Sequence, residues 1–157
     1  MVNHRIVVAI DFGTTYSALA WASTASPSHI TLIGSWPSAG NRVQHSTPTE
    51  ISYTNTGSLD EYTWGYDIEP NQRRLKWFKL LLETDDERVS GVVPIPEGLS
   101  ATDVARDFLK ALYQHAIETL WRQNSEVVMK MTKVDFVVTV PAVWSDAAKN
   151  SRCILVV

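Results

Sequence analysis

The chain has 157 residues, of which 45% are hydrophobic and 20% are charged, as is typical of a globular protein with one core. Its net charge of -3 gives no basic field of the kind that nucleic-acid-binding proteins use, and its single cysteine, Cys153, excludes an intrachain disulfide. Because the sequence has no uninterrupted run of about 18 apolar residues, we expect a cytoplasmic protein with neither nucleic-acid nor membrane partners.

Strands and loops are expected in the first part of the chain. An apolar run over residues 5–11 and an alternating run over 17–23 predict a β-hairpin around the turn Gly13-Thr14-Thr15. Clusters of Ser, Pro, Gly and Asn mark the connecting loops. The elements expected next are short strands at 29–34 and 49–53, a loop over 35–44, a turn at 55–57, a helix at 71–83 and a surface loop over 84–99.

A long helix is predicted to begin after Ser100. Ser100 and Asp103 have the spacing of a capping box. Beyond them, apolar residues recur every four positions, at Val104, Phe108, Leu112, Ala116 and Leu120. A stripe of this kind packs against a sheet. His115 lies within the same helix and is expected to be structural rather than a ligand.

An apolar strand over residues 133–140 follows this helix and ends at Pro141. Ser145 is placed to cap a further helix that begins at Asp146. The order of hairpin, short strands, inserted segment, long helix and apolar strand indicates an α/β fold.

The turn after the first strand has the layout of a phosphate site. Gly13 lets backbone N–H groups approach an anion closely, and Thr14 and Thr15 add hydroxyl groups. Asp11, at the exit of the strand, is placed to hold a hydrated magnesium ion beside the phosphates. An ordinary hairpin with one nearby carboxylate is the alternative interpretation.

Three segments in the same order resemble the actin-like ATPases and, within them, the seventy-kilodalton heat-shock chaperones. They are the motif Ile-Asp-Phe-Gly-Thr-Thr-Tyr-Ser at 10–17, Asn41-Arg42 followed by Thr47-Pro48-Thr49, and Val-Thr-Val-Pro-Ala-Val-Trp-Ser-Asp at 138–146. The run Trp-Phe-Lys-Leu-Leu-Leu at 77–82 resembles the divergent fungal-type branch and its animal relatives. The resemblance covers about residues 5–150.

The resemblance implies a ribonuclease H-like fold, with a mixed sheet and an inserted α/β subdomain. Residues 1–157 would be the first lobe of a nucleotide-binding domain, with a core at 1–36 and 100–150, an inserted segment at 37–99 and a divergent tail at 151–157. In the family, a catalytic Glu-Pro segment, a second phosphate loop and the adenosine pocket come later than residue 157. We therefore expect a fragment or truncated form that does not hydrolyse ATP by itself.

The resemblance also implies roles for individual residues. Gly13, Thr14, Thr15 and Tyr16 would hold the β and γ phosphates of ATP, and Asp11 would bind Mg²⁺ through water. Lys79 matches the family's catalytic lysine, whose charge stabilises the transferring phosphoryl group.

Three further positions, Lys76, Pro141 and Lys149, show how closely this chain follows the family pattern. Lys76 competes with Lys79 as the phosphate lysine. Pro141 matches a proline that couples nucleotide state to the partner domain, whereas Lys149 stands where the family usually has Arg. An ammonium lacks the bidentate geometry of a guanidinium, so this relay is weakened.

The function implied is that of a heat-shock-chaperone-like lobe that, in a complete protein, binds and hydrolyses ATP to drive conformational change. Unfolded clients and co-chaperones would be partners of the full-length form. Two alternatives stay open: a sugar-kinase-like member of the same superfamily, which opens with a similar Asp-Phe-Gly-Thr-Thr motif, and a non-catalytic remnant or scaffold module. The Val-Pro-Ala-Val-Trp-Ser-Asp segment favours the heat-shock branch over the sugar kinases.

Overall fold

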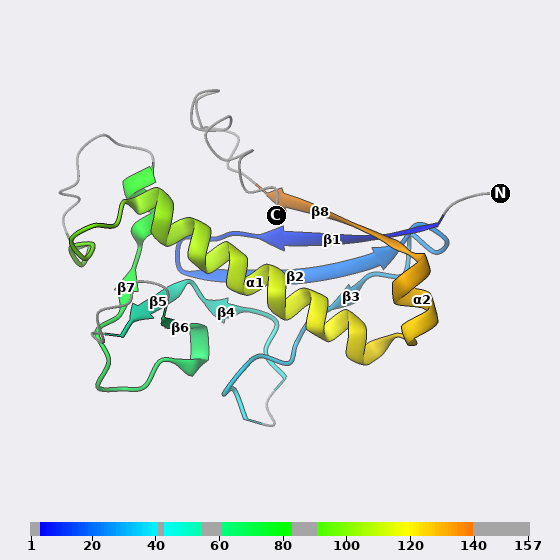
Figure 1. The fold of residues 1–157 in the computed structure, drawn as a ribbon, viewed down its shortest axis with the longest axis horizontal. Helices are drawn as coiled ribbons and strands as arrows, with labels where there is room; N and C mark the ends of the chain where they lie inside the picture. Colours follow the sequence, from blue (N-terminus) through cyan, green and yellow to red (C-terminus); the bar gives the residue numbers. More distant parts are fainter. Residues whose placement is uncertain (1–3, 41–42, 55–60, 83–90, 140–157) are drawn as a thin grey trace.

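The main sheet of the protein is mixed and has the strand order β3-β2-β1-β8, with β4 paired to the start of β2. The computed structural model describes residues 4–40, 43–54, 61–82 and 91–139. β1 pairs antiparallel with β2 and parallel with β8, so it is the central strand (Figure 1). The strands of this sheet are β1 (Arg5–Asp11), β2 (Tyr16–Ser23), β3 (Thr31–Leu32), β4 (Thr47–Pro48) and β8 (Lys133–Thr139).

A second, smaller sheet with the order β6-β5-β7 lies within the part of the chain expected to be an inserted segment. All of its pairings are antiparallel. Its strands are β5 (Glu50–Tyr53), β6 (Tyr62–Trp64) and β7 (Leu75–Lys76). A short 3-10 helix, η1 (Gly65–Asp67), follows β6, and another, η2 (Phe78–Leu82), follows β7. The fold is therefore mixed α/β, as predicted.

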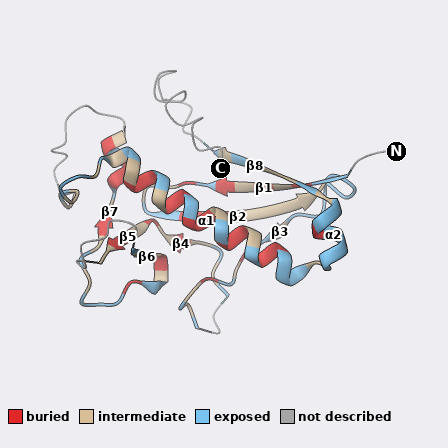
Figure 2. Ribbon diagram, viewed as in Figure 1, coloured by how far each residue is buried: buried red, intermediate tan, exposed pale blue. Residues whose placement is uncertain are grey.

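Helix α1 (Ala101–Gln123) lies across one face of the main sheet (Figure 1). Its capping box forms as predicted, because the Ser100 hydroxyl accepts from the Asp103 N–H and the Asp103 carboxylate accepts from the Ser100 N–H at 2.9 Å. All five residues of the predicted apolar stripe are fully buried, and Figure 2 shows the buried positions recurring along α1. Burying each large apolar side chain stabilises the fold by about 1.5 to 3 kcal/mol. In this core, Phe12, which directly follows β1, lies against Phe108 of α1, with ring centres 6.1 Å apart.

The prediction of a helix at 71–83 is wrong. Leu75 and Lys76 instead form β7, where Leu75 pairs with Ile51 of β5. Trp77 then takes a φ of 61°, in the left-handed region that a right-handed helix excludes. Only the short 3-10 helix η2 follows. The segment forms a strand, a sharp turn and a short 3-10 helix in succession. A local pattern does not indicate this, because the strand pairs with β5, which is distant in sequence.

The remaining predicted elements are confirmed where the structure describes them. The hairpin, the strand at 50–53 and the strand from Lys133 match their predicted positions, whereas β3 is only two residues long. The structure also has α2 (Glu126–Met131), β4 and β6, which the sequence patterns do not indicate. The turn at 55–57, the end of the last strand at 140 and the helix expected from residue 146 lie outside the described residues.

A candidate phosphate-binding turn

The turn between β1 and β2 requires glycine at position 13. A Cβ atom added to Gly13 would lie 2.0 Å from the backbone oxygen of Tyr16, far inside van der Waals contact. The chain thus doubles back on itself closely at this point, and only a residue without a side chain permits it. Such a turn directs successive backbone groups to one place, which is the geometry that anion-binding loops use.

Asp11 and Thr139 lie side by side at the ends of two parallel strands. They are register partners in the β1–β8 pair, and the Thr139 hydroxyl donates to a carboxylate oxygen of Asp11 at 2.8 Å. Both residues are exposed to solvent. The hydrogen bond fixes the orientation of the Asp11 carboxylate at the carboxyl edge of the sheet, where ligands of open α/β sheets bind.

The side chain of Lys79 reaches the same turn from the second half of the chain. It is buried, and its ammonium donates a hydrogen bond to the backbone oxygen of Phe12, 67 positions away in sequence. The ammonium also lies 5.0 Å from the centre of the Phe12 ring. A positive charge is thereby held directly beside the residue that connects Asp11 to Gly13.

Three phenylalanine rings fix the relative position of the turn, η2 and α1. Phe12 lies 6.3 Å from Phe78 and 6.1 Å from Phe108, and Phe78 lies 5.9 Å from Phe108, measured between ring centres. All three side chains are buried. Because Phe78 directly precedes Lys79, this aromatic triad holds the lysine against the turn. Each aromatic pair at such a separation contributes about 0.5 to 1.5 kcal/mol of stability beyond the contribution from burying its surface.

The other side of the turn is braced by β4 and the residue after it. The Thr49 N–H donates to the backbone oxygen of Thr15 at 2.9 Å. The hydroxyls of Ser17 and Thr49 also share a buried hydrogen bond of 2.8 Å. The backbone of the turn is therefore fixed on both sides.

The predicted phosphate contacts differ in how far they are exposed. Thr14 is half-buried, and Thr15 and Tyr16 are exposed. Within the ranges that the structure describes, the Thr14 and Thr15 hydroxyls have no hydrogen-bond partner, so both are available to a ligand. The structure brings Asp11, Gly13, Thr14, Thr15 and Lys79 to one end of the main sheet.

Lys76, the other candidate lysine, lies in a different environment from Lys79. It belongs to β7, is half-buried, and places its ammonium 5.1 Å from the centre of the Trp77 ring. No contact of Lys76 with the turn residues is present among the described residues. Within that part of the chain, Lys79 is the one of the two lysines that contacts a residue beside the turn.

The donor set near Asp11 suits magnesium better than a tightly liganded metal. Among the described residues, no group of three or more His, Cys, Asp or Glu is placed to hold a metal ion. Asp11 supplies one exposed carboxylate, and the Thr139 hydroxyl lies beside it. Mg²⁺ commonly binds through one or two carboxylates, several waters and substrate phosphates. The residues present fit a hydrated Mg²⁺ ion.

Other residues singled out from the sequence are not among those assigned to this turn. Asn41, Arg42, Pro141 and Lys149 lie outside the described residues. His115 is structural, as expected: its Nε2 atom lies 2.7 Å from the backbone oxygen of Ser35, and its ring stacks on Trp36.

Sequence reasoning did not find Thr139, Thr49 or the aromatic triad as supports of the turn. Thr139 could have been found by aligning the ends of two parallel strands, because Asp11 is the last residue of β1 and Thr139 the last of β8. No local pattern indicates that Phe78 and Phe108 meet Phe12.

Comparison with known proteins gives homology to two human heat shock proteins. Heat shock 70 kDa protein 12B of Homo sapiens is 32% identical over 168 aligned residues, which cover 94% of this chain and 23% of that protein. Heat shock 70 kDa protein 12A is 26% identical in Homo sapiens and 27% in Mus musculus, over 162 residues that cover 92% of this chain. This homology supports an Hsp70-like, actin-like ATPase relationship, and the mixed α/β fold is consistent with a lobe of that kind.

The chain spans 23% of the length of each of these relatives. No protein-family model matches it. Of the helices in the described ranges, none is long and apolar enough to cross a membrane.

Proposed function

We propose that this chain is the phosphate-binding part of an Hsp70-like ATP-binding domain. Gly13, Thr14, Thr15 and Tyr16 bind the β and γ phosphates of ATP, Asp11 holds Mg²⁺ through water, and Lys79 places its charge at the γ phosphate. A cytoplasmic location belongs to the same proposal.

The observation that carries this proposal is the contact between Lys79 and Phe12. It joins the start of the chain to η2 and buries an ammonium group at the edge of the turn. A lysine ammonium has three donors, so one hydrogen bond to the Phe12 oxygen can coexist with contacts to a phosphate.

Each of these residues has a distinct task in phosphoryl transfer. Backbone groups of the turn position the phosphates, and the Lys79 charge stabilises the negative charge on the equatorial oxygens. When bound, Mg²⁺ neutralises charge on the β and γ oxygens. The Thr139 hydroxyl orients the Asp11 carboxylate, which would hold the ion through water.

A second part of the proposal concerns the full-length protein. We propose that the full-length form hydrolyses ATP to change conformation, and that unfolded clients and co-chaperones are its partners. The names of the homologues favour this branch over a sugar kinase.

Calorimetric titration of the 157-residue chain with Mg-ATP tests the proposal. One wall of a phosphate site offers few contacts, so we expect a dissociation constant no tighter than about 1 mM, or about 4 kcal/mol of binding free energy, and no phosphate release above background. Lys79→Met should abolish the binding, and Lys76→Met is the matched control that should retain it. Loss of binding in Lys76→Met alone would refute the assignment of the lysine.

A further inference from the structure

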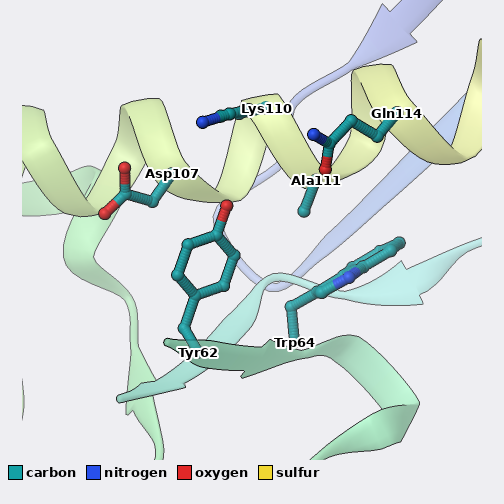
Figure 3. Close-up of a pocket in the computed structure, with 6 residues that line it drawn as sticks. All are labelled: Tyr62, Trp64, Asp107, Lys110, Ala111 and Gln114. Atoms are coloured by element: carbon teal, nitrogen blue, oxygen red, sulfur yellow. The ribbon is translucent and has the colours of Figure 1, made fainter. Parts of the chain in front are cut away.

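A pocket of about 450 Å³ lies between β6 and the middle of α1, and none of its lining residues belongs to the phosphate turn. Tyr62 and Trp64 of β6 form one wall, and residues from three consecutive turns of α1 form the other (Figure 3). The helical lining residues are Asp107, Lys110, Ala111 and Gln114.

The aromatic wall is rigid. The Trp64 ring meets Trp36 and Phe108 edge to face, with ring centres 6.3 and 6.0 Å apart, and both of these neighbours are buried. Tyr62 packs edge to face against Tyr53 at 5.9 Å. Figure 3 shows the Tyr62 ring standing between β6 and the helix, with its hydroxyl directed toward α1. A flat ring would find two preformed aromatic surfaces here.

Three polar groups of this pocket have no partner in the part of the chain that the structure describes. They are the Lys110 ammonium, the Gln114 amide and the Tyr62 hydroxyl. Lys110 and Gln114 lie one helical turn apart, so their side chains project from the same side of α1 (Figure 3). Burial, with a smaller contribution from the charge of Asp107, raises the pKa of Tyr62, and its hydroxyl therefore stays protonated and able to donate.

The one carboxylate of the pocket is already engaged. One oxygen of Asp107 accepts from the Tyr53 hydroxyl at 2.9 Å, and the other lies 3.5 Å from the Nε atom of Arg106. The groups left over are thus mainly hydrogen-bond donors, one of them a full positive charge.

We propose that this pocket binds a small organic anion, namely a carboxylate attached to a flat ring. The carboxylate pairs with Lys110 and accepts hydrogen bonds from Gln114 and Tyr62, and the ring packs between Tyr62 and Trp64. The competing possibility is an organic cation, because aromatic rings beside Asp107 could also hold a quaternary ammonium group. The positive charge of Lys110 opposes it.

NMR titrations of the 157-residue chain with benzoate, benzyl alcohol and benzyltrimethylammonium separate these cases, since the three probes share a ring and differ in charge. We expect benzoate to bind more tightly than either of the others. Lys110→Met should weaken benzoate binding by about tenfold, the equivalent of one charge-assisted hydrogen bond. Tyr62→Phe, which keeps the ring, should weaken it several-fold.

Two control variants locate the probe. Lys130→Met removes an exposed lysine of α2 that pairs with Glu126, and it should leave benzoate binding unchanged. Lys79→Met should also leave it unchanged, and this makes the result independent of the proposed ATP site. Melting temperatures near that of the parent chain show that each variant is folded.

Three results would overturn the proposal. They are no binding of benzoate, equal binding to the parent chain and Lys110→Met, and tighter binding of benzyltrimethylammonium than of benzoate. Loss of benzoate binding in Lys79→Met would place the probe at the turn and overturn it as well.

Discussion

The phosphate turn and the pocket on α1 hold their polar groups in opposite ways. At the turn, the geometry is fixed by a glycine in close contact with its own chain, by one backbone and one side-chain hydrogen bond to Thr49, and by the aromatic triad. In the pocket, the walls are rigid, but the Lys110 and Gln114 side chains are exposed and can move. The turn should therefore be sensitive to small changes in packing, whereas the pocket should tolerate substitution with little loss of stability.

The largest effect is expected at the aromatic triad. Phe78→Ala removes a fully buried ring that touches both Phe12 and Phe108, and it should lower the free energy of unfolding by about 3 to 5 kcal/mol. Leu80→Ala is the matched control in η2, because Leu80 is 37% exposed. Urea unfolding measures both. Similar losses in the two variants would mean that the triad does not support the turn.

The rate of ATP hydrolysis should depend most on the two charged residues, Asp11 and Lys79. In a full-length protein, Asp11→Asn and Lys79→Met should each slow single-turnover ATP hydrolysis by on the order of a hundredfold, or about 2.7 kcal/mol in the barrier. Asp11→Asn should leave the melting temperature nearly unchanged, because the amide oxygen can still accept from Thr139.

Rapid-mixing measurements of the chemical step test this prediction. Unchanged rates in both variants would show that neither charge acts on the phosphates. Lys79 is buried and donates to the Phe12 oxygen, and both the alanine and the methionine variant lose this hydrogen bond. Methionine keeps most of the side-chain volume, so it avoids the cavity that alanine would add.

Gly13→Ala should cost about 2 kcal/mol or more of stability, because its Cβ would collide with the Tyr16 backbone oxygen and force the turn to open. Gly40 is the control: it has a φ of 66° but no atom within 4 Å of an added Cβ, so Gly40→Ala pays only for the backbone conformation. Thermal unfolding compares the two. Equal losses would contradict the close approach at Gly13.

The smallest effect concerns pH. Burial lowers the pKa of His115 below its value in the unfolded chain, so below about pH 6.5 the unfolded state binds the proton more readily. Stability contributed by neutral His115 is present above that pH and is lost as the pH falls through the folded pKa. His115→Gln should flatten the dependence of the melting temperature on pH between 5 and 7.5. An unchanged slope would show that groups other than His115 cause the pH dependence of the melting temperature.

Features set by neighbouring residues could be predicted from the sequence. The capping box of Ser100 and Asp103, the apolar stripe of α1 and the alternation of β2 all depend on short spacings, and all three are present. The glycine turn and its aspartate were also found this way.

Features set by distant partners could not be predicted. Residues 71–82 have the apolar content of a helix, but pairing of Leu75 with Ile51 and the left-handed φ of Trp77 decide their structure. For the same reason, Lys76 and Lys79 could not be distinguished before the contact with Phe12 was known. The pocket combines β6 with α1, and no local pattern brings these residues together.

The central claim is that the β1–β2 turn and Lys79 form a phosphate site, and an amide NMR titration of the 157-residue chain with Mg-ATP tests it most directly. The account predicts that the N–H resonances of Gly13, Thr14 and Thr15 shift with added nucleotide, that the shifts vanish in Lys79→Met, and that the resonances of Lys110 and Gln114 stay in place. Unmoved turn resonances at saturating nucleotide, or shifts confined to other parts of the chain, would contradict it.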